Sequence, residues 1–408
     1  MCSVTAVAEL TSVEDALDLV LARVRPLPAE PVALADAAGR VLAEDAVAAI
    51  DLPRFASSAM DGFALRSADT PGRLPVVARV AAGRPAGRAL APGEAMAIST
   101  GGVVPEGADA VVPIELVRDD DATVVVPQAA PPGANVRPRG GDVREGEVVV
   151  PAGTPLTPPR LAALASAGVA RLRCGRRPRV AIVSTGTELR RPGETLRDGE
   201  IYESNGLMLA ALVAGAGAVV VPPEQVADDA GSHEAALARG LEADVLVTSG
   251  GVSVGPHDLV RGTLAGLGAV EVFWGVAMRP GKPLSFATRG ETLVFGLPGN
   301  PVSSLVGALL FLLPALRALQ GDARPKPRFE SGRLAVAATR RSSRDDFQRA
   351  LVERSGDDLL LRPLAGQESH MIARAAAADA LVHIPRGEGE LAAGAVVRYL
   401  ALDGAAGA

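Results

Sequence analysis

From Arg179 onward the chain alternates short apolar strands with stretches of helical periodicity. The expected elements are strand 180–184, helix 206–214, strand 218–221, helix 232–239 and strand 245–248. Such alternation is typical of a mostly parallel, doubly wound sheet, because parallel strands need a crossover connection that is usually a helix. Ligands of such sheets bind at the carboxyl ends of the strands. The pattern therefore predicts both the fold of this region and the edge where a site would lie.

The last strand and helix of this unit are contained in TLVFGLPGNPVSS, residues 292–304. Asn300 suits the N-cap, and Pro301 suits the first helical position, where its missing N–H is lost at no cost. Gly296 and Gly299 let a ligand approach the backbone, and free N–H groups at the helix start favour an anion. The segment predicts an anion site, although an ordinary capped turn explains this fragment alone at least as well.

Two further glycine-containing loops follow strands of the same unit. They read STGTE over residues 184–188 and TSGGVS over residues 248–253. In a parallel sheet these loops and the 296–300 turn converge on one edge, and their uncovered backbone amides form a nest that suits phosphate or another oxyanion. In any single loop the glycine can serve only a tight turn. Three such loops together favour an oxyanion site.

Acidic residues accompany the same edge. Glu188 ends the first loop, Asp228 and Asp229 follow another strand, and Asp258 follows the TSGGVS loop. Carboxylates beside phosphate-binding amides imply a divalent cation, since unpaired negative charges would repel the ligand, and magnesium is the expected ion. For at least one of Asp228 and Asp229, interaction with a helix dipole is the alternative.

A rigid basic turn, MRPGKP, lies between the last two of these loops, at residues 278–283. Its prolines and glycine present Arg279 and Lys282 three residues apart, which suits a compact dianion. Most such turns are only solvated surface. Here the apolar flanks, with Phe273 and Phe286 among them, place the turn between core strands and favour a functional role.

The remaining sequence predicts further domains. Helical spacing of apolar residues predicts an amphipathic helix over 13–24, and short Val- and Ala-rich strands between Gly and Pro predict a small inserted β domain. A helix over 158–167 would return to the first helix, and short strands near the C-terminus predict a β barrel or sandwich. The predicted boundaries are 1–51 with 143–177 for a linking domain, 52–142 for the inserted domain, 178–323 for the α/β domain and 324–408 for the C-terminal domain.

Composition excludes several functional classes. The formal charge of −6, from 41 Lys and Arg against 47 Asp and Glu, gives no global field that would attract nucleic acid or an anionic membrane. Two cysteines offer no disulfide framework, and four scattered histidines do not predict a zinc or copper centre. No signal peptide is recognisable, so a cytoplasmic protein is expected. The longest apolar run, 305–319, falls short of a ~20-residue membrane span and predicts a buried helix.

Eight motifs occur in one order along essentially the whole chain. They are SSAMDGFA, STGG followed by PEGADAVVP, RGGDVREGE, STGTEL, YESNG, TSGGVSVGPHD, MRPGKP and FGLPGNPVSS. In these motifs the chain resembles the molybdopterin molybdenumtransferases, which comprise the bacterial MoeA proteins and the E domain of gephyrin. The resemblance implies a multidomain fold with a central three-layer α/β/α domain on a mostly parallel sheet, an inserted small β domain, an elongated linking domain and a C-terminal β barrel.

The resemblance also implies an activity. The family inserts molybdate into the dithiolene of adenylylated molybdopterin and releases AMP, with Mg²⁺. It works as a homodimer whose active site lies between the α/β domain of one subunit and the inserted domain of the other, with the linking domain in dimerisation. Expected partners are a molybdopterin adenylyltransferase and other proteins of molybdenum cofactor biosynthesis, and neither a nucleic acid nor a membrane.

Site residues follow from the motifs by similarity. Catalytic roles would fall to Asp61, Thr100, Asp142, Glu188, Asp258 and Lys282. Contacts to the cofactor and substrates would come from Thr185, Gly186, Ser204, Asn205, Gly250, Gly251, Ser253, Arg279, Lys282, Pro298, Gly299, Asn300, Pro301 and Ser303. The magnesium ligands would be Glu188, Asp228 and Asp258.

Two alternatives remain beside this reading. An adenylyltransferase acting one step earlier shares the α/β unit and its TSGG loop, but it has no need of the first-half motifs or the C-terminal domain. A non-catalytic scaffold resembling gephyrin would have lost the catalytic acids, which are present here.

Two positions depart from the expected pattern. Arg279 stands where some relatives carry lysine, and Glu203 precedes Ser204 where a shorter acid is expected.

Overall fold

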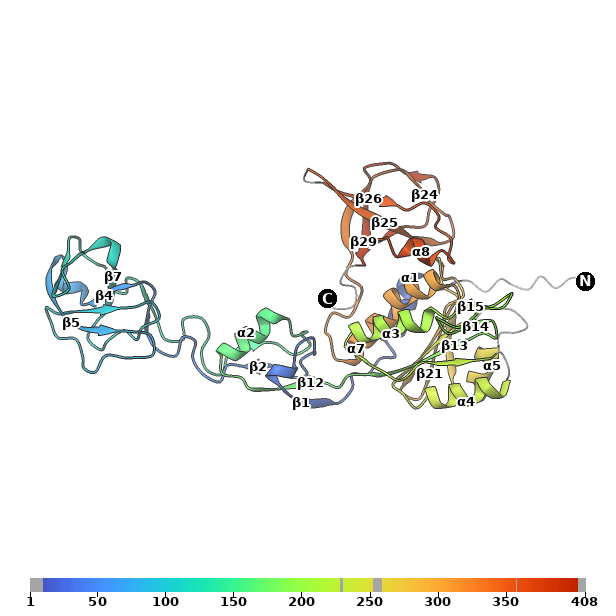
Figure 1. Ribbon diagram of the computed structural model, residues 1–408, viewed down its shortest axis with the longest axis horizontal. Helices are drawn as coiled ribbons and strands as arrows, with labels where there is room; N and C mark the ends of the chain where they lie inside the picture. The colour runs from blue at the N-terminus through green and yellow to red at the C-terminus, as the bar shows by residue number, and fades with distance from the viewer. Residues whose placement is uncertain (1–9, 228–229, 252–258, 357, 403–408) are drawn as a thin grey trace, which may run out of the picture.

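The computed structural model describes residues 10–227, 230–251, 259–356 and 358–402. The molecule is elongated, with a β domain at one end, a small linking region in the middle, and an α/β domain with a β barrel at the other end (Figure 1). The expected multidomain α/β plus β architecture is confirmed.

The α/β domain is built on a seven-stranded sheet with the order β16-β13-β18-β22-β21-β19, and β17 also pairs with β13. The strands from β16 to β22 pair in parallel, whereas β21 pairs antiparallel with both of its neighbours, β22 and β19. The predicted mostly parallel sheet is confirmed. The strand bounds are β13 (Arg179–Thr185), β16 (Val219–Val220), β17 (Glu224–Val226), β18 (Val245–Ser249), β19 (Val270–Trp274), β21 (Ser285–Arg289) and β22 (Thr292–Leu297).

Helices cover both faces of this sheet. Successive residues of β13 alternate between two cores, because side chains along a strand point to opposite faces. Val180 and Ile182 belong to one core, whereas Ala181 and Val183 belong to the other. The first core includes α1 (Val13–Leu21), α3 (Asn205–Gly215), α6 (Pro301–Gly307), the π turn η4 (Ala308–Leu312) and α7 (Leu313–Leu319). The second core includes α4 (Ala230–Gly240) and α5 (Leu259–Gly266).

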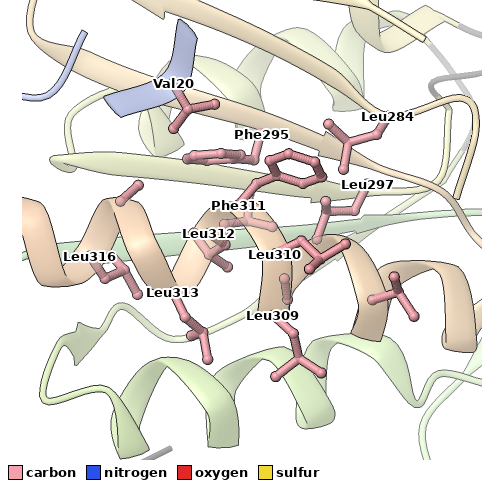
Figure 2. Packing of buried hydrophobic residues seen from close by; sticks show 14 of the residues in the cluster. Val20, Leu284, Phe295, Leu297, Leu309, Leu310, Phe311, Leu312, Leu313 and Leu316 are labelled. Atoms are coloured by element: carbon pink, nitrogen blue, oxygen red, sulfur yellow. The ribbon is translucent and has the colours of Figure 1, made fainter. Parts of the chain in front are cut away.

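The continuous helix 301–319 is the central element of the first core. By length and composition alone it could cross a membrane, but 83% of its most apolar window is buried in the protein, which confirms the predicted buried helix. Phe311 points towards Phe295 of the sheet, whereas Leu309 and Leu313 point away from it (Figure 2). The π turn comes shortly before Pro314. Proline has no N–H to donate to the carbonyl of residue 310, and its ring would clash with that carbonyl in a regular α-helix.

The inserted domain is a six-stranded sheet with the order β7-β4-β6-β5-β9-β8. Residues of β4 alternate between two small cores, with Phe63 and Leu65 in one and Ala64 in the other. The strands are β4 (Gly62–Leu65), β5 (Gly72–Val80), β6 (Ala95–Ile98), β7 (Ala110–Pro113), β8 (Arg118–Asp119) and β9 (Thr123–Val126), and beside this sheet β3 (Ser57–Ser58) pairs with β10 (Val136–Arg137).

The linking region consists of two short antiparallel ladders and one helix. It pairs β1 (Ala29–Ala33) with β12 (Arg171–Gly175) and β2 (Ala46–Val47) with β11 (Val148–Val150), next to α2 (Pro158–Ser166). The expected return of this helix to the first helix is wrong, because α1 packs against α7 and η4 of the α/β domain. Helical periodicity shows that α1 buries one face, but it does not identify the neighbour. The domain boundaries therefore stay a prediction.

The C-terminal strands close into a five-stranded barrel, in which β25 pairs with both β26 and β27. Its strands are β23 (Glu330–Leu334), β25 (Asp345–Ser355), β26 (Asp358–Pro363), β27 (Ala380–Ile384) and β29 (Val396–Ala401), with a side pair of β24 (Ala338–Thr339) and β28 (Glu390–Leu391) and the short helix α8 (Ile372–Ala375). A strand from the α/β domain, β20 (Met278–Arg279), adds to β25 in parallel.

Candidate active site

Three strand ends of the α/β sheet lie side by side. Ser184 of β13 pairs with Ser249 of β18, which in turn pairs with Leu297 of β22. Beyond these pairs the N–H of Gly250 donates to the Leu297 carbonyl at 3.0 Å. The loops that carry Thr185 and Gly186, Gly250 and Gly251, and Pro298 to Asn300 therefore lie together at one edge of the sheet.

Glycine is required where these loops cross. Gly250 and Gly251 have φ angles of +94° and +64°, which L side chains rarely adopt. A Cβ on Gly250 would lie 2.9 Å from the Thr185 carbonyl oxygen, and one on Gly299 would lie 3.6 Å from the Gly250 Cα. A Cβ on Gly251 would lie 2.5 Å from the Val260 side chain, so the loops pack too closely here for any residue but glycine.

Asn205 connects two of these loops. It is 7% exposed at the start of α3, and its amide nitrogen donates to the Ser249 hydroxyl and to the Gly299 carbonyl, both at 2.8 Å. Its own Oδ1 and the Thr185 hydroxyl are buried without a hydrogen-bond partner among the described residues. Ser204, immediately before it, is exposed and makes no capping hydrogen bond. Asn205 therefore ties the loops together through its amide nitrogen.

Carboxylates at this edge have different surroundings. Glu203, absent from the predicted site set, accepts from the Ser184 hydroxyl at 3.1 Å and from the Gly206 N–H at 2.7 Å, so it caps α3. Glu188 is exposed, and its carboxylate covers Gly186 so closely that a Cβ there would meet Oε2 at 2.6 Å. Across the described ranges no cluster of three potential metal ligands occurs. Three predicted site residues lie outside those ranges: Asp228, Ser253 and Asp258.

The turn into α6 has the predicted N-cap at Asn300 and Pro301 in the first helical turn. Two details differ from the expectation. The Asn300 side chain makes no capping hydrogen bond, and the N–H of Val302, expected to be free, donates to the Ser369 carbonyl at 3.1 Å. The C-terminal domain therefore occupies part of this helix start. Ser303 is 4% exposed and follows directly.

The basic turn lies against the same helix. A Cβ on Gly281 would lie 3.5 Å from the Ser303 carbonyl oxygen, so the turn and the start of α6 adjoin. Arg279 forms an ion pair with Asp346 of the barrel, Nη1 to Oδ2 at 3.6 Å. Lys282 is exposed and has no ion-pair partner in the described part of the chain. Arg279 and Lys282 thus lie beside the Pro298–Ser303 segment.

The first-half motifs form a second group in the inserted domain. Asp61 Oδ1 accepts from the Thr100 backbone N–H at 2.6 Å and from its hydroxyl at 3.0 Å. The Thr100 N–H, followed by its hydroxyl, lowers the pKa of Asp61 below its ordinary value despite partial desolvation. Asp142 is exposed, and its N–H donates to the Leu52 carbonyl at 2.9 Å. Asp61 is therefore a fixed, ionised carboxylate at neutral pH.

Within one chain the two groups are far apart. The inserted domain with Asp61 and Thr100 lies at the opposite end of the molecule from the α/β domain (Figure 1). The structure brings together the α/β loops and the basic turn, and separately Asp61 with Thr100, but it does not bring these sets to one place. Asp346 and Ser369 were missed because nothing in the barrel sequence links these positions to the site.

Comparisons with known proteins cover nearly the whole chain. Family models described as "MoeA N-terminal region (domain I and II)", "Probable molybdopterin binding domain" and "MoeA C-terminal region (domain IV)" match residues 11–168, 181–318 and 331–402. The molybdopterin molybdenumtransferase 2 of Mycobacterium tuberculosis is 39% identical over 400 residues, which is 94% of this chain and 98% of that protein. The molybdopterin molybdenumtransferase of Haemophilus influenzae is 34% identical over 379 residues, 91% and 93% of the two chains.

Solved structures agree with this relationship. The molybdopterin biosynthesis MoeA protein from Pyrococcus horikoshii OT3 has a TM-score of 0.83 at 28% identity and covers 96% of this chain and 99% of its own. Another solved structure of a molybdopterin biosynthesis MoeA protein from that archaeon has a TM-score of 0.79 at 30% identity, with the same coverage. The chain therefore belongs to the MoeA family.

Proposed function

We propose that this protein is a molybdopterin molybdenumtransferase, which inserts molybdate into adenylylated molybdopterin and releases AMP. One observation carries the proposal: the glycine loops lie together at the strand ends, and the Arg279–Lys282 turn adjoins the helix that follows one of them, so backbone amides and two cations lie in one region. Molybdate is a tetrahedral dianion, and fixed cations with amide dipoles can hold it without a soft protein ligand. The dithiolene sulfurs that finally bind molybdenum belong to the substrate.

The oxygen-rich edge of the sheet fits a magnesium ion. Mg²⁺ prefers oxygen ligands, and the Glu188 carboxylate is exposed there, while the Thr185 hydroxyl is buried without a partner among the described residues. Glu188, with Asp228 and Asp258, would hold the ion. When bound, it would polarise the phosphate of the adenylate. The chain's own amides and cations would orient that phosphate beside the molybdate.

A homodimer would complete the site. The inserted domain, with Asp61 beside β4 and Thr100 beside β6, lies far from the α/β domain of its own chain, so a second copy would supply these residues and Asp142 to the site (Figure 1). The exposed side of α3 supports an interface, because this helix is apolar on all sides and Leu207 is 70% exposed. We further propose a cytoplasmic location and cooperation with the adenylyltransferase that makes the substrate.

Formation of active molybdenum cofactor from adenylylated molybdopterin and molybdate tests the function. We expect activity in the wild type, loss of about ten-fold or more in Lys282→Ala, and little change in Lys326→Ala. Lys326 is a matched control because it is an exposed lysine outside the predicted site residues and pairs with Asp18. Adenylylated product formed from ATP and molybdopterin, without molybdate consumption, would instead identify an adenylyltransferase.

A further inference from the structure

The segment that joins α7 to the barrel, residues 320–329, carries exposed basic residues at alternate positions. They are Arg324, Lys326 and Arg328, and the residues between them are half-buried. Both intervening residues are prolines, which fix their own backbone φ angle. The basic side chains therefore face solvent from a segment with little backbone freedom.

A groove of about 620 Å³ lies between this segment and the end of α1, and a groove of this size suits a small ligand. Leu21 of α1, Arg324, Pro325 and Arg328 line it. Lys326 forms an ion pair with Asp18 of α1 at 2.6 Å, so its charge is already compensated. Arg324 and Arg328, by contrast, form no side-chain hydrogen bond or ion pair within the described ranges. Two free guanidinium groups therefore border the groove.

A third arginine, Arg317, lies in the last turn of α7 and is half-buried. Burial, followed by the positive charge of Arg328, lowers the pKa of Arg317 below its ordinary value. Asp322 opposes this shift, but its Oδ1 accepts from the Arg324 N–H at 2.9 Å, and no ion pair to Arg317 forms in the described part of the chain. The end of a helix favours one cation, but it does not explain a second one beside it. An anion between the two would relieve their repulsion.

The groove is remote from the candidate active site. The continuous helix 301–319 begins at the active-site turn and ends beside Arg317 and the linking segment. Its 19 residues span about 27 Å at the rise of an α-helix. The N–H of Leu27 donates to the Leu319 carbonyl at 2.8 Å, which joins the chain leaving α1 to this far end. A ligand in the groove would therefore occupy a separate site.

We propose that Arg317, Arg324 and Arg328 form a second anion site, which binds the diphosphate group of a small ligand. A guanidinium offers a planar fork of N–H donors that matches two phosphate oxygens. One phosphate group carries about two negative charges, so three cations suit two adjacent phosphates. Leu21 and Pro325 would contact an apolar part of the ligand. The inference goes beyond the proposed function, which makes no use of this groove.

The charge of the whole chain favours a small ligand over a large polyanion. The formal charge is −6, so the positive potential is confined to the groove and its rim. A nucleic acid or a long acidic polypeptide would extend beyond the groove and meet the negative charges around it. A diphosphate or a nucleoside diphosphate would not.

Isothermal titration of the full-length protein with pyrophosphate and with ADP, at constant ionic strength, tests the site. Every protein used carries Lys282→Ala, because the candidate active site also attracts oxyanions. We expect binding in this background, and we expect Arg317→Gln and Arg328→Gln each to weaken it roughly ten-fold. Arg84→Gln is the control. It removes an exposed arginine that forms no ion pair among the described residues and lies between β5 and β6 of the inserted domain. Its affinity should stay within about two-fold of the background protein.

Thermal unfolding without ligand gives a second readout. Arg328→Gln should not lower the midpoint, because it removes repulsion and no printed contact. A lower midpoint would show that Arg328 stabilises the fold and would contradict an unpaired charge kept for a ligand. This measurement also shows that the variants compared are folded.

The titration has outcomes that decide for or against the site. Tighter binding of ADP than of pyrophosphate identifies a nucleoside diphosphate, and equal binding identifies the diphosphate alone; both support the site. No binding of either probe contradicts it, as does binding that Arg317→Gln and Arg328→Gln leave unchanged. Polyglutamate that binds more tightly than both probes would contradict a small ligand. None of these results depends on cofactor formation, so the proposed function can fail while this site stands.

Discussion

At the scale of single residues, Asn205 connects the loops that follow β18 and β22. Replacement by alanine would leave the buried Ser249 hydroxyl and the Gly299 carbonyl, in a part-buried hydrogen bond, without their donor. We expect Asn205→Ala to lower the free energy of unfolding by roughly 1–3 kcal/mol. Ser204→Ala, at an exposed neighbour without a capping bond, should change it by less than about 0.5 kcal/mol. Urea unfolding followed by the fluorescence of Trp274, the only tryptophan, measures both. Equal effects of the two substitutions would refute the bridging role.

Gly250 gives a second prediction at this scale, because a side chain there meets two obstacles. Its φ of +94° is unfavourable for alanine, and the new Cβ would lie 2.9 Å from the Thr185 carbonyl oxygen. We expect Gly250→Ala to destabilise the α/β domain by about 1–3 kcal/mol and to reduce cofactor formation. Gly262→Ala is the matched control, since Gly262 lies in α5 with nothing within 4 Å of the added Cβ. That substitution should be neutral or stabilising by up to about 1 kcal/mol.

At the scale of elements, Asp244 joins the linking region to the sheet. It precedes β18 and accepts two hydrogen bonds from the Arg176 guanidinium, at 2.7 and 3.0 Å, and one from the Arg179 N–H at 2.7 Å. Burial raises the pKa of Asp244, but these donors outweigh burial and hold the pKa below its ordinary value. A carboxyl whose folded pKa is lowered stabilises the fold above its unfolded pKa of about 3.9. That contribution is lost as the pH falls through the folded pKa.

Asp244→Asn should therefore destabilise the protein in a pH-dependent way. We expect a loss of roughly 1–3 kcal/mol at pH 7, constant down to about pH 5, that shrinks below about pH 4, where the wild-type carboxyl is protonated as well. Glu242→Gln, at an exposed carboxylate two residues away, should show little effect at any pH. Trp274 fluorescence in urea from pH 3 to 8 provides the comparison. A difference that grows towards low pH would contradict the assignment.

Local patterns predicted the elements well, and long-range pairings poorly. The β13, β18 and β22 strands are visible as apolar runs followed by glycine, and Asn300 and Pro301 mark the start of α6 because their preferences are local. The pairing of β20 with β25 and the capping of Val302 by Ser369 join residues more than sixty positions apart. These contacts are hydrogen bonds between backbone N–H and carbonyl groups, which every residue except proline can form. No particular residue type in the sequence therefore reveals which segments pair. The barrel contribution to the site therefore became visible only in three dimensions.

At the scale of the whole molecule, the elongated shape separates two halves of the candidate site. Asp61 and Thr100 are fixed to each other in the inserted domain, whereas Lys282 and the glycine loops lie in the α/β domain at the other end (Figure 1). The motif order alone could not reveal this separation, since distance along a chain says little about distance in space. If Asp61 is catalytic as proposed, its separation from the α/β loops of the described chain calls for a second chain to complete the site.

Subunit mixing tests this arrangement directly. Asp61→Asn and Lys282→Ala variants should each be nearly inactive as homodimers, because every site then contains the same defect. In a mixed dimer one site would combine both substitutions and the other would combine neither, so one site works. Random reassociation makes about half of the dimers mixed, and about a quarter of the wild-type activity should return.

Mixing Asp61→Asn with Thr100→Ala is the control, because both residues lie in one half-site and no intact site can form. No recovery in the first mixture would show that each chain completes its own site, and recovery in the control would show that Asp61 and Thr100 do not act in one half-site.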